Sequence, residues 1–171
     1  FGVKIITGDR DLLQLVNDRI IVNLPGKNTG ETIDYTPEKV FAYMGVTPDQ
    51  IVDYKALVGD ASDNIPGVPG VGNKTALTLL SEYKTLDDIY ANLENLSGRA
   101  RTRLEAGRQS AYLSYDLATI RTNVKIIVDL DKALTNNIDY DAVGAIFKEL
   151  EFKTLFNRMR ELPVILQASP P

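Results

Sequence analysis

Two pairs of aspartates are the residues of this chain whose types and spacing could do chemistry. Asp9 and Asp11 follow a β-branched run, and Asp60 and Asp63 come just before a glycine-rich stretch. The sequence contains no histidine and no cysteine, which excludes the commonest general base and the thiolate ligands of zinc. Hard divalent cations prefer carboxylate oxygens. The four aspartates therefore indicate a site for Mg²⁺ or Mn²⁺.

The second acidic pair runs directly into a glycine-rich turn and the predicted start of a helix. Glycine adopts positive φ and has no Cβ, so Gly67, Gly70 and Gly72 allow a sharp bend and a close approach of another backbone. The helix start adds unpaired N–H groups, a positive dipole end and a cation, which all favour an anion. Its residues are Asn73, Lys74 and Thr75. The pattern predicts contact with a phosphate.

Two glycine motifs that bind nucleotides do not fit this stretch. A P-loop has Gly directly before Lys, whereas Asn73 separates Gly72 from Lys74, and the dinucleotide fingerprint needs the reverse glycine spacing after a strand. Residues 68–76 instead match the helix-hairpin-helix pattern of apolar, Pro, Gly, apolar, Gly, any, Lys, any, Ala. A turn that merely joins two helices would explain the glycines but not the neighbouring acids.

Composition sets the class of the protein and its charge distribution. The 171 residues, 44% of them hydrophobic, fit one domain or one and a half with a sizeable core. The net charge of −4 is unevenly distributed, because residues 49–63 are acidic and residues 97–108 are basic. The basic stretch supplies candidate DNA-binding residues, namely Arg99, Arg101, Arg103 and Arg108. No apolar run approaches the roughly 18 residues of a membrane span. We expect a cytoplasmic monomer without membrane contact.

The elements that position these residues follow from hydrophobic periodicity and capping signals. We predict strands at 3–7, 19–24, 31–33 and 124–128, with a hairpin between the second and third. Helices are predicted at 12–16, 36–45, 47–58, 73–83, 85–93, 97–120, 140–150 and 151–162. Asp9 and Asp11 then lie at a strand's carboxyl end, where open α/β sheets bind ligands. The alternative is that Asp11 caps the next helix and Asp9 is a turn residue.

With residues 7–11, 59–67 and 68–76 in place, the chain resembles the 5′-nuclease (5′-3′ exonuclease) domain of bacterial DNA polymerase I, within the flap endonuclease family. The match is to the C-terminal part of that domain. It implies that Asp9, Asp11, Asp60 and Asp63 form the family's second acid group in a two-metal site. It also implies a K⁺ site that touches a DNA phosphate, assisted by Lys74. The K⁺ ligands would be the backbone carbonyls of Pro66, Val68 and Val71.

The resemblance also implies a fold class and a domain division. We expect an α/β protein in which the edge portion of a twisted mixed sheet is followed by a mainly helical helix-hairpin-helix region. Residues 1–58 would be the C-terminal part of the α/β nuclease core and residues 59–122 the DNA-binding region. Residues 123–162 would close the domain with a strand and helices, and residues 163–171 have linker composition. The chain begins without Met and is expected to be a piece of a longer protein.

The family's leading strand with its Asp, its helical arch and its Glu-x-Asp-Asp acids do not occur in this sequence. The chain therefore has about half of the family's carboxylates. We expect a fragment of a structure-specific 5′ nuclease, inactive by itself, whose parent hydrolyses DNA phosphodiesters at 5′ ends or flaps. The expected partners are duplex, nicked or 5′-flap DNA and the polymerase domains of the same parent chain. The alternative functions are a non-catalytic, structure-selective DNA-binding module and a scaffold domain.

Overall fold

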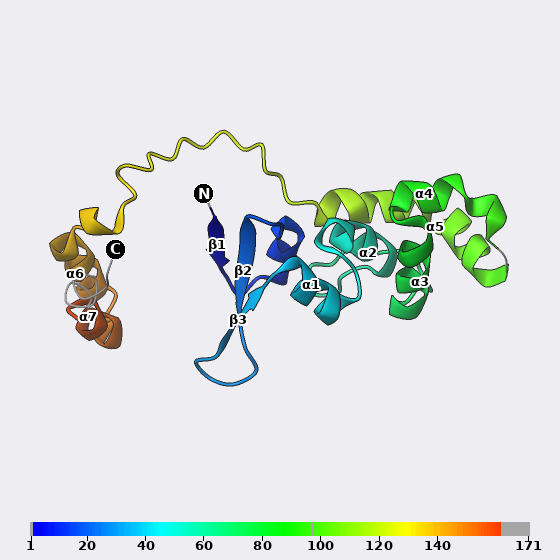
Figure 1. The fold of residues 1–171 in the computed structure, drawn as a ribbon. Helices are drawn as coiled ribbons and strands as arrows, with labels where there is room; N and C mark the ends of the chain where they lie inside the picture. Colours follow the sequence, from blue (N-terminus) through cyan, green and yellow to red (C-terminus); the bar gives the residue numbers. More distant parts are fainter. Residues whose placement is uncertain (1, 97, 162–171) are drawn as a thin grey trace. The chain divides into compact units, whose positions relative to one another are not determined.

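The computed structural model describes residues 2–96 and 98–161 (Figure 1). The chain divides into two compact units, the first ending at Thr122 and the second beginning at Asn123. Each unit is described by itself. The predicted linker at residues 163–171 lies outside the described residues.

The first unit begins with a small mixed sheet. Strands β1 (Val3–Ile6), β2 (Ile20–Pro25) and β3 (Thr32–Tyr35) lie in the order β1-β2-β3. β1 pairs with β2 in parallel and β2 with β3 antiparallel, with Val22 opposite both Ile5 and Tyr35. The strands predicted at 3–7, 19–24 and 31–33, and the hairpin between the second and third, occur within two residues of their expected bounds. The helix expected at 12–16 is a 3₁₀ helix, η1 (Arg10–Leu15), which begins directly after the turn that leaves β1.

Helices make up the rest of this unit, and the predicted capping residues set several of their ends. They are α1 (Pro37–Met44), η2 (Pro48–Gln50), α2 (Ile51–Val58), α3 (Asn73–Tyr83), α4 (Leu86–Ala91), η3 (Leu93–Asn95) and α5 (Gly98–Ala118). The Thr36 side chain accepts a hydrogen bond from Lys39 N at the start of α1, and Gly45 ends that helix with φ +78°. Thr85 caps α4 in the same way. The mixed sheet followed by helices confirms the predicted α/β class.

Helix α2 lies at the centre of this unit and packs most extensively against α5. Its side chains Ile51, Ala56 and Leu57 are almost completely buried. The carboxylate of Asp53, also buried, accepts a hydrogen bond from Leu86 N at the start of α4 (2.8 Å). Because α2 is fixed on several sides, the residues at its C-terminal end have a defined position.

The C-terminal end of α5 is bonded to the start of the chain. In η1, the side chain of Gln14 donates to the Ala118 carbonyl (3.0 Å) and accepts from Ile120 N (2.9 Å). These two bonds join segments more than 100 residues apart. The long helix therefore spans the unit and is tied to the element that follows β1.

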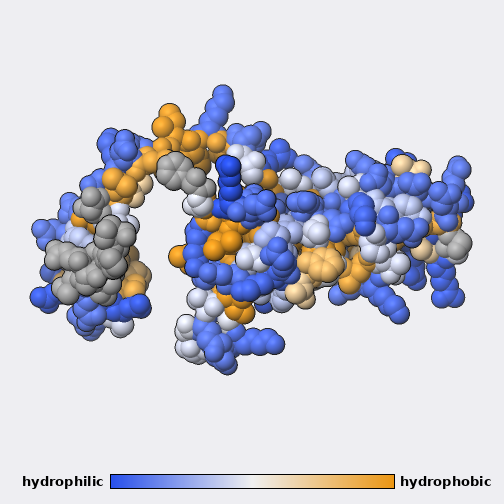
Figure 2. Space-filling model, in the orientation of Figure 1, coloured by the Kyte–Doolittle hydropathy of each residue, from blue (hydrophilic) through white to orange (hydrophobic). Residues whose placement is uncertain are grey.

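The second unit contains η4 (Thr135–Asn137), α6 (Tyr140–Glu149) and α7 (Lys153–Met159). α6 and α7 agree with the helices predicted at 140–150 and 151–162, whereas η4 was not predicted. The predicted strand at 124–128 is wrong, because this segment forms no strand. Its side chains are exposed, with 99% of Ile127 accessible, and Figure 2 shows the apolar surface along this stretch. A β-branched run forms a strand only when another strand or a packed surface receives it.

Candidate functional site

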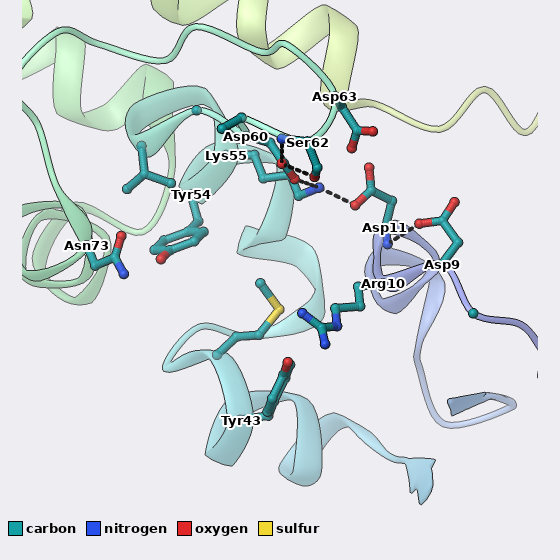
Figure 3. Close-up of a pocket in the computed structure, with 15 residues that line it drawn as sticks. Asp9, Arg10, Asp11, Tyr43, Tyr54, Lys55, Asp60, Ser62, Asp63 and Asn73 are labelled. Atoms are coloured by element: carbon teal, nitrogen blue, oxygen red, sulfur yellow. Dashed lines mark hydrogen bonds and ion pairs between the residues drawn. The ribbon is translucent and has the colours of Figure 1, made fainter. Parts of the chain in front are cut away.

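Three of the four predicted aspartates come together at one edge of the first unit (Figure 3). Carboxylate oxygens of Asp11, Asp60 and Asp63 all lie within 4.8 Å of one another. Asp9 lines the same cavity but is not part of this group. Its carboxylate instead caps η1 by accepting a hydrogen bond from Asp11 N (2.9 Å). The capping role that the alternative interpretation gave to Asp11 thus belongs to Asp9.

The acidic pair after α2 is held by a closed turn. Two backbone hydrogen bonds join Asp60 and Ile65, at 2.9 and 2.8 Å, and enclose the exposed residues 61–64. Within this turn the Asp60 carboxylate accepts hydrogen bonds from the N–H (3.0 Å) and the hydroxyl (2.5 Å) of Ser62. The turn places Asp63 beside Asp11 and Asp60, and the side chain of Asp63 takes no part in these bonds.

Lys55 is a site residue that the sequence analysis did not identify. Its ammonium group donates to Asp11 Oδ1 and to Asp60 Oδ2, the latter at 2.8 Å, and only 9% of its side chain is exposed. Burial alone would lower the pKa of Lys55, but its two carboxylate partners outweigh burial and raise it. Hydrogen bonds from Lys55 and then Ser62 lower the pKa of Asp60 to about 2. A lysine within the apolar run of α2, five residues before Asp60, was the available signal.

The acid cluster forms one side of an open cavity of about 620 Å³. The remaining lining includes Arg10 from η1, Tyr43 from α1, Tyr54 from α2 and Asn73 from the start of α3 (Figure 3). The cavity therefore extends from the carboxylates to the first helical turn after the glycines. Its size is within the range of sites that bind small molecules or parts of larger ligands.

The glycine loop, defined as residues 66–72, lies against the backbone at the end of α2. Gly67 has φ +63°, and a Cβ on it would lie 2.3 Å from Gly59 N. Gly59 is equally restricted, since its own Cβ would lie 2.6 Å from Ile65 O. Only glycine allows two backbones to approach this closely. Gly67 and Gly70 (φ +82°) use the positive φ that glycine allows, whereas Gly72 is extended at φ −104° as the N-cap of α3.

One face of α5 holds the glycine loop. The hydroxyl of the fully buried Ser114 accepts from Gly67 N (2.9 Å), and the Ser110 hydroxyl donates to Gly67 O (2.6 Å). One helical turn away, Val68 packs so closely on Gly107 that a Cβ there would lie 2.7 Å from Val68 Cγ1. This face thus binds both polar backbone groups of Gly67 and fixes the loop.

The predicted basic residues of α5 have different surroundings. Arg103 Nη1 donates to Gly70 O (2.6 Å), so this arginine helps to hold the glycine loop. Arg101 forms an ion pair with Glu105 (2.7 Å), and Arg108 lies over two tyrosine rings. Arg99 is exposed. Three of the four arginines therefore also make contacts within the protein.

The predicted phosphate-binding residues at the start of α3 lie at the surface. Asn73 and Lys74 are exposed and Thr75 is half-buried. Among the described residues, no side chain caps this helix, whose N-cap is Gly72. Its first N–H groups consequently remain available to an anion, with Lys74 beside them.

The chemistry of the acid cluster suits a hard divalent cation. Asp11, Asp60 and Asp63 offer oxygen ligands, which Mg²⁺ and Mn²⁺ prefer, and among the described residues they form the one group that meets this spacing. The ammonium group of Lys55 supplies positive charge to two of the three carboxylates. The cluster therefore fits such an ion, provided that the ammonium group of Lys55 gives up part of its contact with Asp11 and Asp60.

The fold and the site together define a class of α/β protein in which an acidic cluster adjoins a glycine loop carried by helices. Residues 46–141 match the family described as 5′-3′ exonuclease, C-terminal SAM fold. The chain therefore belongs to the 5′-3′ exonuclease family, which confirms the family resemblance noted in the sequence. None of the helices within the described ranges has the length and apolar character needed to cross a membrane.

Similar proteins agree with this membership. The chain is 42% identical over 160 residues to DNA polymerase I of Bacillus caldotenax and 41% identical over 162 residues to that of Bacillus subtilis. These matches cover 93% and 94% of the chain but only 18% of either relative. A solved structure of the T5 5′-exonuclease with bound zinc is 25% identical, with a TM-score of 0.60 over 68% of this chain and 42% of that one.

Proposed function

We propose that the protein containing this chain is a structure-specific 5′ nuclease that hydrolyses DNA phosphodiesters at 5′ ends or flaps by a two-metal mechanism. The main support is the convergence of Asp11 with Asp60 and Asp63, because their oxygens lie within 4.8 Å although Asp11 is far from the other two in sequence. The relatives named DNA polymerase I and the zinc-bound T5 5′-exonuclease agree with this proposal. The polymerase domains of the parent chain would then be its partners, in a cytoplasmic monomer.

Asp11, Asp60 and Asp63 would hold a Mg²⁺ or Mn²⁺ ion, with Asp9 in the same cavity as a further ligand. When bound, such an ion supplies Lewis acidity and a water of lowered pKa. Lys55 keeps Asp11 and Asp60 close together before the metal arrives, because it donates to both. This arrangement avoids the repulsion that crowded carboxylates would otherwise produce.

The glycine loop and the start of α3 would bind the phosphate backbone of duplex, nicked or 5′-flap DNA as a helix-hairpin-helix. The exposed positions of Gly72, Asn73 and Lys74 support this role, and Gly70 and Thr75 would adjoin the phosphate. Gly67, which is buried with both backbone groups bonded to α5, would act by positioning the loop. Carbonyls of Pro66, Val68 and Val71 would hold a K⁺ ion. The Val71 N–H bonds to Val68 O (3.0 Å) and fixes the turn that carries them. Arg99, Arg101 and Arg103 would add contacts.

The chain by itself should bind DNA but cut it poorly. Among the described residues, the acid cluster supplies ligands for one ion, whereas a two-metal centre holds two ions about 4 Å apart. The experiment compares the chain with its intact parent on a labelled 5′-flap duplex with Mg²⁺ or Mn²⁺. Asp63→Asn is the test variant, and Asp18→Asn, at an exposed position outside the cavity, is the matched control.

We expect cleavage by the parent that Asp63→Asn abolishes and Asp18→Asn preserves, with little cleavage by the chain alone. Asp63-independent cleavage by the parent would contradict the proposed metal site. Robust Asp63-dependent cleavage by the chain would contradict the expectation that it is inactive.

A non-catalytic, structure-selective DNA-binding module is the second candidate, favoured by one observation. Lys55 already compensates Asp11 and Asp60, so the cluster can persist without a metal. Calorimetric titration with Mn²⁺ separates the two functions. Binding that is lost in Asp63→Asn supports the nuclease, and the absence of binding in the unmodified parent supports the module.

A further inference from the structure

The wall of the cavity opposite the acid cluster has no role in metal binding. Figure 3 shows Arg10 extending away from Asp9 and Asp11 toward Tyr43, so that a cation and an aromatic ring face the cavity on the side away from the carboxylates. Tyr54 lines the cavity as well. A cavity of about 620 Å³ that combines an acidic side with a cationic, aromatic side can receive a ligand that has both a phosphate and a ring.

Arg10 is the cation of this cavity that carboxylates do not engage. Lys55 is bound by two of them, whereas Arg10 makes no ion pair within 4.0 Å in the described ranges. A guanidinium group binds phosphate oxygens through paired N–H groups in a planar geometry. Its position between Asp9 and Asp11 in the sequence ties its backbone to the metal cluster. A phosphate on Arg10 would therefore lie in the same cavity as the carboxylates.

Tyr43 provides a supported but accessible ring. Its ring meets that of the buried Tyr35 nearly edge-on, with centroids 5.4 Å apart and planes at 65°. Half of Tyr43 remains exposed. A ring held on one side and open on another is suited to stacking with a nucleobase, and such stacking needs no particular base because each has a π-face.

From this arrangement we infer that Arg10 and Tyr43 form a subsite for one nucleotide of a single-stranded DNA segment. Arg10 binds its phosphate and Tyr43 stacks against its base. The inference rests on the proposed function, because it assumes that the chain binds DNA. It goes further by assigning the single strand to this wall and the duplex to the glycine loop, none of whose residues lines the cavity.

The test measures binding of the 171-residue chain to two labelled DNAs in the presence of Mg²⁺. One is a duplex with a 5′ oligo-dT flap, and the other is the same duplex without the flap. Arg10→Gln should weaken binding of the flapped DNA about tenfold and reduce its salt dependence by about one phosphate contact. It should leave the flapless duplex unchanged. Lys27→Gln, in the exposed turn after β2, is the matched control for loss of one positive charge.

Tyr43 is tested on the same DNAs. Tyr43→Ala should weaken binding of the flapped DNA about tenfold, whereas Tyr43→Phe should retain binding because the ring remains. Thermal unfolding of each variant shows whether the fold is preserved, and a purely structural effect would weaken binding of both DNAs. The inference is overturned if Arg10→Gln behaves like Lys27→Gln. It is also overturned if Arg10→Gln or Tyr43→Ala weakens binding of both DNAs equally.

A further variant distinguishes failure of this inference from failure of the proposed function. Lys74→Gln should weaken binding of both DNAs, because it removes the cation beside the glycine loop. If Lys74→Gln has this effect while Arg10→Gln has none, the duplex surface stands and the subsite is refuted. If Lys74→Gln has no effect on either DNA, the proposed duplex-binding surface is refuted instead.

Discussion

Replacing Gly67 by alanine should disrupt the contact between the acid-bearing turn and the glycine loop. The added Cβ would lie 2.3 Å from Gly59 N and 2.6 Å from Val58 C. Both atoms belong to the backbone at the end of α2, so no side-chain rotation can relieve the overlap. Either α2 and the loop must separate, or the bonds from Gly67 to α5 must break.

The magnitude follows from two separate costs. The φ of +63° imposes about 1–2 kcal/mol on any residue with a Cβ. Overpacking against the backbone adds about 1–3 kcal/mol. The expected loss is therefore about 2–5 kcal/mol, a large part of the roughly 5–15 kcal/mol that stabilises a typical domain. Gly30→Ala isolates the first cost, because Gly30 has φ +85° and no atom within 4 Å of an added Cβ.

Urea unfolding of the two variants and the unmodified chain provides the assay. We expect the midpoint of Gly67→Ala to fall clearly below that of Gly30→Ala, and Mn²⁺ binding to weaken in Gly67→Ala alone. Equal losses of stability would show that the dihedral penalty accounts for both variants. The close approach of Gly59 and Gly67 would then have no energetic role.

Three other predictions concern buried polar groups. Lys55→Met should cost about 1–3 kcal/mol in EDTA, because it leaves the partly exposed carboxylates of Asp11 and Asp60 without their cation. Thermal unfolding should then show a larger stabilisation by Mg²⁺ than in the unmodified chain. Ser114→Ala should cost about 1–3 kcal/mol in urea unfolding, since Gly67 N–H loses its acceptor. Burial raises the pKa of Asp53 above 3.8, so the native state keeps this proton longer than the unfolded chain. Stability should therefore fall as the pH rises from about 3.8 through the raised pKa, and Asp53→Asn should remove that dependence in unfolding midpoints measured across this range.

Local signals predicted most of the fold. Thr36 and Gly45 bracket α1 because a side-chain cap and a left-handed glycine act within one helical turn. The strand predicted at 124–128 does not form, because its formation depends on more than local signals. Its β-branched residues satisfy the local pattern, but strand formation depends on a partner that the pattern does not specify.

The candidate site shows the same division. Asp60 and Asp63 could be found from their position before the glycines, and Asp11 from its position after a strand. The role of Lys55 could not be derived, because it depends on a contact with Asp11 across 44 positions of sequence. Arg103 was assigned to DNA from its charge alone. Its bond to Gly70 O depends on the packing of α5 against the loop, which the local sequence does not specify.

The bonds of α5 also define which parts of the molecule should open together. Gln14 ties the C-terminal end of the helix to η1, and Ser114, one turn earlier, ties it to Gly67. Breaking the α5 contacts would release both segments at once, so their amide hydrogens should exchange with solvent as one cooperative unit. The amides of Gly67 and Ile120, 53 positions apart, should therefore share a single opening free energy. The exposed segment at 124–128 should exchange much faster.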